Sequence, residues 1–439
     1  MITRRGYRWT EMYLLLLPAA FLVLGVTQLL LIRTGHQVVT QKSLPTLDAL
    51  GPALGLIAAF AGAHVLLCII APEADQTILP IVGMLSTIGV LMALRLGPDL
   101  GAPELGTKQL LWVVIGLAFC VLTVWGTRNL RWLRLYKYTW AVIGIALVAV
   151  ALVHAHNIDF NSPSRDVLGV GPGNFQPSEL LKICLVVFFA GYLSENREML
   201  AIGGKKVGRF TLPPPKQLGP LAVMLGLSLI IFVGLRELGL AMLVFGLFLA
   251  MLYVASGRFD FVVASLGLFA VGAFICYNLF SYVRDRVAIV STAFDPGVAT
   301  DKGYQIVQGL IAFGVGGVFG QGLGLGHPTF VPAISTDYVA AAIGEEFGLA
   351  GLLAILGLFL LLIYRGMRVA VLARDSFNQL LACGLTAVFA LQTLVILAGN
   401  LKLMPLTGIP LPFVAYGGSS VIANFIIVGL LIRLSKADA

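Results

Sequence analysis

Charged residues are scarce in this sequence. Asp, Glu, Lys and Arg together make up 11% of its 439 residues, and hydrophobic residues make up 59%, whereas soluble globular domains carry about 25% charged residues. Apolar runs of roughly 18 or more residues recur along the whole length, which is typical of membrane-spanning helices. The composition excludes a soluble globular protein and predicts an all-α polytopic membrane protein.

Patterns that would bind a metal or a nucleotide are also missing. The glycine run between Gly314 and Gly326 is followed by no GK[ST] and lies in no strand–turn–helix context, so it is neither a P-loop nor a Rossmann site. His154 and His156 form an HxH pair without further ligands nearby. The sequence therefore shows no evident cofactor or metal site, and dependence on a divalent cation is left open. The five cysteines lie in apolar runs without a CxxC, which indicates small core residues: Cys68, Cys120, Cys184, Cys276 and Cys383.

About twelve spans are expected. If the N-terminus is cytoplasmic, most of the 29 Lys and Arg residues fall on the cytoplasmic side, as the positive-inside rule requires. Both termini are therefore expected in the cytoplasm, and the net charge of +8 needs no nucleic acid to explain it. The spans lie near residues 13–32, 51–71, 78–96, 109–126, 138–155, 179–193, 217–235, 237–256, 260–281, 343–364, 378–399 and 411–433.

One outside loop is much longer than the others. Residues 282–342 separate the ninth and tenth spans, and long loops in compact proteins are usually functional or disordered. The glycine-rich piece in its middle, residues 303–326, is a poor match to an ordinary span. It is expected to be a re-entrant or interfacial element covered by protein or water.

Three carboxylates gather at the end of this loop. Asp337 follows Ser335 and Thr336, so it is either part of a helix N-cap or a general base at the membrane–water boundary. Glu345 and Glu346 open the next apolar run, where a helix N-terminus would favour their charge.

Two further pairs of charged residues stand at span ends. Glu179 and Lys182 are i,i+3 neighbours just after Pro177. Lys182 should face the protein interior or a watery cavity, because a charge in lipid is costly. Arg236 and Glu237 join two spans almost without a loop. Each pair is either a structural ion pair or a substrate contact.

Five segments together resemble one family. They are FQPSELLK at 175–182, RELGLAMLVFG at 236–246, GYQIVQGLIAFGVGGVFGQGLGLG at 303–326, STDYVAAAIGEEFGLAG at 335–351 and PLTGIPLPFVAYGGSS at 405–420. In this order they are similar to the SEDS proteins, represented by RodA, FtsW and SpoVE. The resemblance covers roughly residues 78–435. It divides the chain into an N-terminal two-span extension, 1–75, and a ten-span core, 76–439, which holds the large outside loop.

The resemblance implies a peptidoglycan glycosyltransferase of the bacterial cytoplasmic (inner) membrane. Such enzymes polymerise glycan strands from lipid II, the undecaprenyl-pyrophosphate-linked disaccharide peptide, during cell elongation or division. They usually work with a class B penicillin-binding protein. The essential aspartate of the family's T-D-[FY] motif corresponds here to Asp337, which would deprotonate the acceptor hydroxyl. Because the leaving group is a lipid pyrophosphate, cations rather than a second acid should stabilise it. The implied substrate-binding residues are Glu179, Lys182, Arg165, Arg236, Glu237, Gln308, Thr336 and Glu346.

The chain departs from the family pattern at three places. The family usually has an Arg-Trp pair upstream of FQPSE, and only Arg165 of this chain matches it. Glu237 stands where many members have Asp. Thr329 stands where some members carry an acid, so no auxiliary acid is expected there.

Two other functions are considered. A lipid flippase or other transporter predicts inverted repeats, broken helices and ionisable groups near the bilayer midplane. A non-catalytic scaffold for cell-wall assembly predicts that substitution of Asp337 is silent. The sequence does not separate elongation from division, with a slight preference for a RodA-like role.

Overall fold

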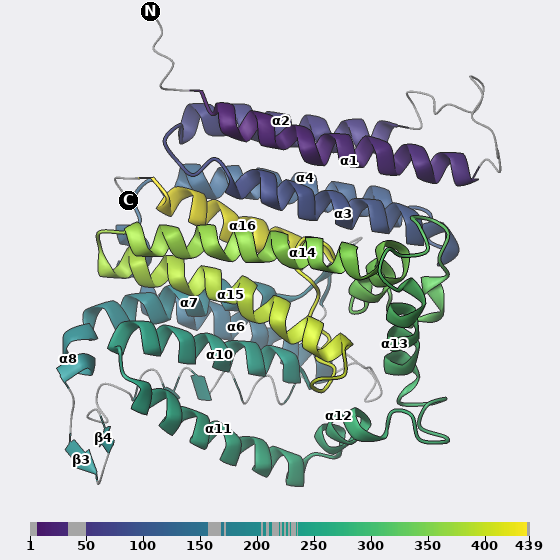
Figure 1. Cartoon of the computed structure of the whole chain (residues 1–439). Coiled ribbons are helices and arrows are strands. Elements are labelled where there is room, and N and C mark those ends of the chain that lie inside the picture. The colour runs from purple at the N-terminus through teal and green to yellow at the C-terminus, as the bar shows by residue number, and fades with distance from the viewer. Residues whose placement is uncertain are drawn as a thin grey trace, which may run out of the picture.

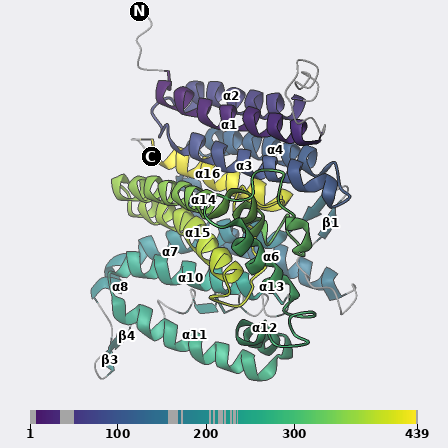
Figure 2. The ribbon, with the colours of Figure 1, turned by 45° about the vertical axis from the view of Figure 1, so that its right-hand side comes forward.

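The computed structural model describes residues 7–33, 50–156, 168–170, 173–202, 205–207, 210–212 and 236–436, with scattered residues between 219 and 234. Long helices lie roughly side by side in one bundle (Figure 1). The helices α1 and α2 form an outer layer on one side, and α11 lies on the opposite side, as Figure 2 also shows. The helix α1 begins and α16 ends at the same end of the bundle (Figure 1).

The prediction of an all-α polytopic membrane protein is confirmed. Within the described residues, nine helices are long and apolar enough to cross a membrane, and two short antiparallel hairpins are the only strands. The first half comprises α1 (Trp9–Arg33), α2 (Gly51–Ile70), α3 (Ile78–Asp99), α4 (Leu105–Gly126), α5 (Arg131–Leu135), α6 (Lys137–His156), β1 (Leu168–Val170), β2 (Gly173–Phe175), α7 (Pro177–Glu195), α8 (Arg197–Ile202), β3 (Lys205–Val207) and β4 (Phe210–Leu212). The second half comprises α10 (Leu238–Ser256), α11 (Phe259–Leu279), α12 (Ser281–Thr292), α13 (Tyr304–Gly316), the 3-10 turn η1 (Pro328–Phe330), α14 (Val339–Leu372), α15 (Ser376–Asn400) and α16 (Gly418–Leu434).

Most predicted spans coincide with these helices, and two points differ. The run at 217–235 lies mostly outside the described residues, and the apolar stretch Lys137–Val153 of α6 and the helix α16 are shorter than the nine, so the count of twelve stays a prediction. The expected start of the last span at residue 411 is wrong, because α16 begins at Gly418. Residues 411–417 form a turn in which Phe413 has φ 64° and its ring packs against Phe389 and Phe425.

The helices α3, α7 and α15 form the centre of the bundle. In α7, 89% of the most apolar window is buried inside the protein, compared with 28% in α1. Because α7 has protein on almost every side, polar side chains on it meet other side chains rather than lipid. This burial allows α7 to carry Glu179 and Lys182, both of which are buried.

The long outside loop is structured, and its glycine-rich part fills a break in α14. Gly348 interrupts the helix with φ 67° and ψ −167°, a conformation available essentially only to glycine. The freed backbone groups pair with residues after α13: Leu349 N–H donates to Gly317 O at 2.9 Å, and Gln321 N–H donates to Glu345 O at 2.9 Å. The element expected to be re-entrant is therefore a 13-residue helix followed by a loop that satisfies the broken helix.

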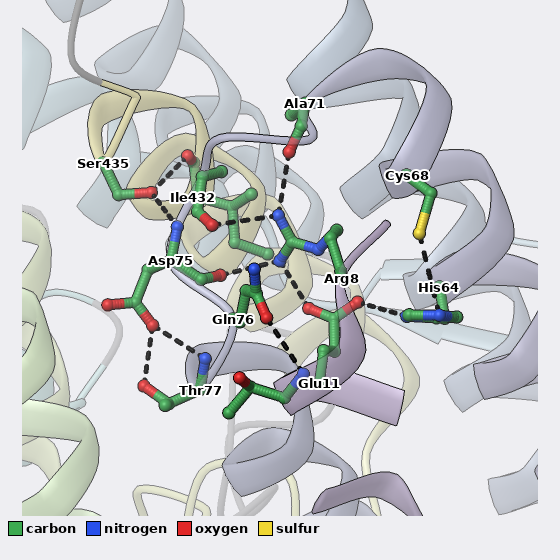
Figure 3. A network of polar contacts seen from close by, with 12 residues as sticks. Arg8, Glu11, His64, Cys68, Ala71, Asp75, Gln76, Thr77, Ile432 and Ser435 are labelled. Carbon is green, nitrogen blue, oxygen red and sulfur yellow. Dashed lines mark hydrogen bonds and ion pairs between the residues drawn. The ribbon is translucent and has the colours of Figure 1, made fainter. Parts of the chain in front are cut away.

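A buried polar network ties α1 and α2 to the core (Figure 3). The fully buried Arg8 pairs with Glu11 and donates to Ala71 O at 2.8 Å and Asp75 O at 2.7 Å. Glu11 also bonds His64 of α2 at 2.7 Å. Asp75 N–H donates to Ser435 Oγ at 2.8 Å, just beyond α16. Thr10 N–H donates to Oε1 of Gln76 at 3.1 Å, so contacts on both sides of the predicted boundary at 75/76 join the extension to the start and to the end of the core.

Candidate functional site

Asp337 lies in a tight turn just before α14. Its N–H donates to Ala333 O at 3.0 Å, and Ala333 has the left-handed φ of 52°. Asn400 at the end of α15 donates from Nδ2 to Asp337 O at 3.1 Å. The N-cap of α14 is Tyr338, with no side-chain cap hydrogen bond. The alternative that Asp337 is the N-cap of α14 is therefore wrong, and its carboxylate does not cap this helix.

The carboxylate of Asp337 faces the loop between α15 and α16, residues 401–417, which we call the hub loop. The position that a Cβ would take at Gly408 lies 3.7 Å from Oδ2 of Asp337. Burial raises the pKa of Asp337, and a hydrogen bond from Thr336 and the positive charge of Arg286 act in the opposite direction. A carboxylate with a raised pKa is a stronger base near neutral pH than an exposed one.

Lys182 is linked to the same loop through Gln392 of α15. Its Nζ lies 2.8 Å from Oε2 of Glu179 and 3.1 Å from Oε1 of Gln392 on α15. Nε2 of Gln392 in turn donates to Pro410 O at 2.9 Å. The predicted i,i+3 pair of Glu179 and Lys182 is present, and it is connected through Gln392 to a residue two positions from Gly408.

Further contacts join α12, α10 and the turn that carries Asp337 to the hub loop. Nη1 of Arg286 on α12 donates to Leu406 O at 3.1 Å. A Cβ at Gly239, near the start of α10, would lie 2.6 Å from Thr407 O. Next to Leu406 in sequence, Pro405 opens the PLTGIPLPFVAYGGSS motif, and near its end Tyr416 N–H donates to Ser335 O at 2.8 Å. The hub loop, which itself holds most of the motif at 405–420, thus contacts the motif segments at 236–246 and 335–351 and is linked through Gln392 to the one at 175–182.

The remaining predicted residues take different positions. Arg236 has φ 62°, and its guanidinium lies 5.7 Å from the ring centroid of Tyr282. The half-buried Glu237 stands at the N-cap position of α10. Gln308 is half-buried on α13, next to Gly309, which packs against the ring of Tyr338.

Two predictions need separate mention. Thr336 donates from Oγ1 to Ala333 O at 3.2 Å, within the turn that carries Asp337. Arg165 lies outside the described residues.

The other two carboxylates of the group have structural partners. Oε1 of Glu345 accepts from His327 N–H at 2.6 Å. Oε1 of Glu346, which is buried, accepts from Nε of Arg95 at 2.7 Å, and Nη2 of Arg95 donates to Gly326 O at 2.8 Å. Neither lies in the first turn of α14, so the helix N-terminus is not what holds them. Both anchor the glycine-rich loop against the break in α14.

Sequence reasoning missed Gln392, Asn400 and Arg95. Gln392 and Asn400 are fully buried polar residues of a membrane span, and Arg95 is a largely buried charge near the end of another. Polar groups inside spans are expensive and usually functional or paired, so their positions alone were a usable signal. Within the described residues, no group of three His, Cys, Asp or Glu side chains could hold a metal ion.

Comparison with known proteins gives a consistent result. The cell cycle protein family model FTSW_RODA_SPOVE matches residues 75–439. The peptidoglycan glycosyltransferase RodA of Mycobacterium tuberculosis is 38% identical over 396 residues, which cover 88% of this chain and 83% of that protein. A probable peptidoglycan glycosyltransferase FtsW of Geobacter sulfurreducens is 37% identical over 270 residues, which cover 60% of this chain and 68% of that protein.

Among solved structures, one reported as "Structural coordination of polymerization and crosslinking by a peptidoglycan synthase complex" has the same fold. It aligns with a TM-score of 0.64 at 24% identity, over 82% of this chain and 97% of that chain. The fold, the order of the motif segments and the match over the core agree. The chain belongs to the FtsW/RodA/SpoVE family of cell cycle proteins.

Proposed function

We propose that this chain is a peptidoglycan glycosyltransferase that polymerises glycan strands from lipid II, with Asp337 as the general base. Relatives 37–38% identical to it carry the name peptidoglycan glycosyltransferase. The observation that carries the proposal is the position of the Asp337 carboxylate, which faces Gly408 of the hub loop while Lys182 is connected to Pro410 of the same loop.

The proposed glycosyl transfer needs a general base but no second carboxylic acid. The acceptor sugar hydroxyl must lose its proton as it attacks the anomeric carbon of the donor, and Asp337 accepts that proton. Burial raises the pKa of Asp337, which strengthens it as a base. The leaving lipid pyrophosphate is already an anion, so fixed positive charge is the main requirement on that side.

Two cations are suited to that role. Arg286 donates to the neutral Leu406 carbonyl, so its positive charge is not cancelled by that contact and can act on a phosphate. Lys182 is paired with Glu179, so the pair carries no net charge, and Lys182 would serve as a directed hydrogen-bond donor. The structure thus favours Arg286 for charge and Lys182 for orientation.

The membrane setting follows from the same geometry. The chain is an integral membrane protein, and we propose that both termini face the bacterial cytoplasm. The start of α1 and the end of α16 lie at one end of the bundle, and the loops around α12 and α13 lie at the other (Figure 1). A lipid-linked donor would keep its tail in the bilayer while its sugars reach Asp337 on the outer face.

A class B penicillin-binding protein is proposed as the partner. The solved neighbour is a synthase complex in which polymerization and crosslinking are coordinated. We further propose a role in elongation, since the match to RodA spans 396 residues and the match to FtsW spans 270. Depletion of the protein should then give rounded cells, whereas a division role predicts filaments.

The transporter alternative gains one observation, because α14 is a broken helix. In transporters, half-helix ends and unwound backbone groups bind the substrate or ion. Here the backbone at the break is paired with residues 317–322 of the glycine-rich loop. These groups are therefore occupied by protein, which favours the enzyme over a transporter that uses this break.

The test is a polymerisation assay with purified protein, lipid II and a matching class B penicillin-binding protein, read as glycan ladders that a muramidase digests. Asp337→Asn keeps the shape and removes the base, so ladders should disappear at equal folded protein. Asp301→Asn, an exposed aspartate of the same outside loop, is the matched control and should keep wild-type ladders. Equal ladders from wild type and Asp337→Asn would exclude Asp337 as the base.

A further inference from the structure

Helix α15 carries two buried amide side chains close to the proposed site. Gln392 and Asn400 are both fully buried. At 1.5 Å per residue, their Cα atoms lie about 12 Å apart along the helix axis. A buried amide is costly unless its donors and acceptors are used, so the partners of each indicate what it does.

Gln392 uses both ends of its amide. Oε1 accepts from Nζ of Lys182 at 3.1 Å, and Nε2 donates to Pro410 O at 2.9 Å. An amide has a separate acceptor and donor end, so it can receive a hydrogen bond from an ammonium and give one to a carbonyl at the same time. Gln392 therefore couples the Lys182 side chain to the backbone of the hub loop.

Asn400 contacts the turn that carries Asp337. Its Nδ2 donates to the main-chain carbonyl of Asp337 at 3.1 Å, and its Oδ1 has no hydrogen-bond partner within the described residues. The contact fixes the turn that carries Asp337 without touching the carboxylate. Asn400 is also the last residue of α15, so the hub loop starts directly after it.

We infer that Gln392 and Asn400 are positioning residues, through which α15 holds Lys182 and the Asp337 turn in a fixed relation across the hub loop. This inference rests on the proposed function, in which Asp337 accepts a proton and Lys182 orients the lipid pyrophosphate. Glycosyl transfer needs the donor phosphate and the acceptor base aligned in one complex. A rigid helix linked to both Lys182 and the Asp337 turn keeps the distance between them more constant than the hub loop alone would.

A purely structural role is the alternative, since each amide also donates a hydrogen bond to a main-chain carbonyl, that of Pro410 or that of Asp337. The two roles differ in what they change. A structural role lowers the amount of folded protein but leaves the activity of each folded molecule intact. A positioning role lowers the turnover of molecules that remain folded.

Gln392→Met and Asn400→Leu remove the amides at similar volume. We expect kcat for lipid II polymerisation to fall roughly 10- to 100-fold per folded molecule, as small misplacements of catalytic groups do. KM should change less than kcat in Asn400→Leu, because that change leaves Lys182 and Gln392 in place. Gln392→Glu keeps the acceptor for Lys182 and loses the donor to Pro410, so its kcat should lie between those of wild type and Gln392→Met.

Thr393→Val is the matched control. Thr393 is a buried residue of α15 next to Gln392, and its hydroxyl has no hydrogen-bond partner within the described part of the chain. Its replacement should leave kcat unchanged. A loss in Thr393→Val equal to that in Gln392→Met would show that any change in this stretch of α15 is harmful, and would overturn the inference.

Hydrogen exchange measured by mass spectrometry supplies a readout without activity. Gln392→Met should speed amide exchange in residues 401–417, and Asn400→Leu should speed it in residues 333–340, while Thr393→Val changes neither. Unchanged exchange in both variants, or wild-type kcat in both, would overturn the inference. Because Asp337→Asn is run in the same assay, activity that survives this change would instead contradict the proposed function, whatever the exchange data show.

Discussion

Substitutions in the buried pair of Glu179 and Lys182 can separate a role in stability from a role in the reaction. Both side chains are almost fully buried, and Nζ and Oε2 lie 2.8 Å apart. Lys182→Met leaves the Glu179 carboxylate buried without its counter-ion, which costs about 3–5 kcal/mol when one partner of a buried pair is removed. The double variant Glu179→Gln/Lys182→Met removes both charges, so its stability should return close to that of wild type.

The assay measures thermal unfolding in detergent and glycan polymerisation at equal folded protein. Lys182→Met should lower Tm and abolish ladders, whereas the double variant should recover Tm but not ladders, because the donor to the lipid pyrophosphate is still missing. Lys108→Met is the control, since Lys108 and Glu104 form an exposed pair at 3.1 Å whose loss should cost less than about 1 kcal/mol. If the double variant regains both Tm and ladders, Lys182 is only half of a structural pair and the reasoning fails.

Two other predictions concern the break in α14 and the pH dependence. A Cβ at Gly348 would lie 2.5 Å from Val318 O, so Gly348→Ala should lower stability by about 1–3 kcal/mol or more from backbone strain. Gly357→Ala, in an open stretch of the same helix, should raise Tm slightly; equal Tm values for both variants would contradict the role of the break. The charge of Arg286 lowers the pKa of Asp337, so Arg286→Gln should raise that pKa. Because the base works deprotonated, the acidic limb of log(kcat/KM) against pH should move to higher pH, and a shift to lower pH would refute this coupling.

Local features of the site could be predicted from the sequence, and long-range ones could not. The pair of Glu179 and Lys182 follows from helical periodicity, since residues three apart share a face. Gln392 and Arg95 were missed because their charged partners lie 210 and 251 residues away in sequence, and no local pattern encodes such a contact.

The start of the last helix illustrates the same limit. Hydropathy continues across residues 411–417, so the sequence predicts a span that begins there. Phe413 instead adopts φ 64°, held by its packing between Phe389 and Phe425. Tertiary packing stabilises a conformation that intrinsic preference disfavours, and as a result the hub loop is seven residues longer at this end than the sequence indicates.

The three carboxylates near the start of α14 divide according to their partners. Glu345 accepts a hydrogen bond from a backbone N–H and Glu346 pairs with Arg95. Both carboxylates therefore hold the glycine-rich loop against the break at Gly348. Asp337 is different, because Thr336 and the charge of Arg286 are the groups that favour its ionised form, while its backbone is fixed by Ala333 and Asn400. An aspartate whose main chain is fixed, and whose carboxylate makes few contacts, is suited to accept a proton from a bound substrate. The neighbouring glutamates supply the rigidity that such a base requires.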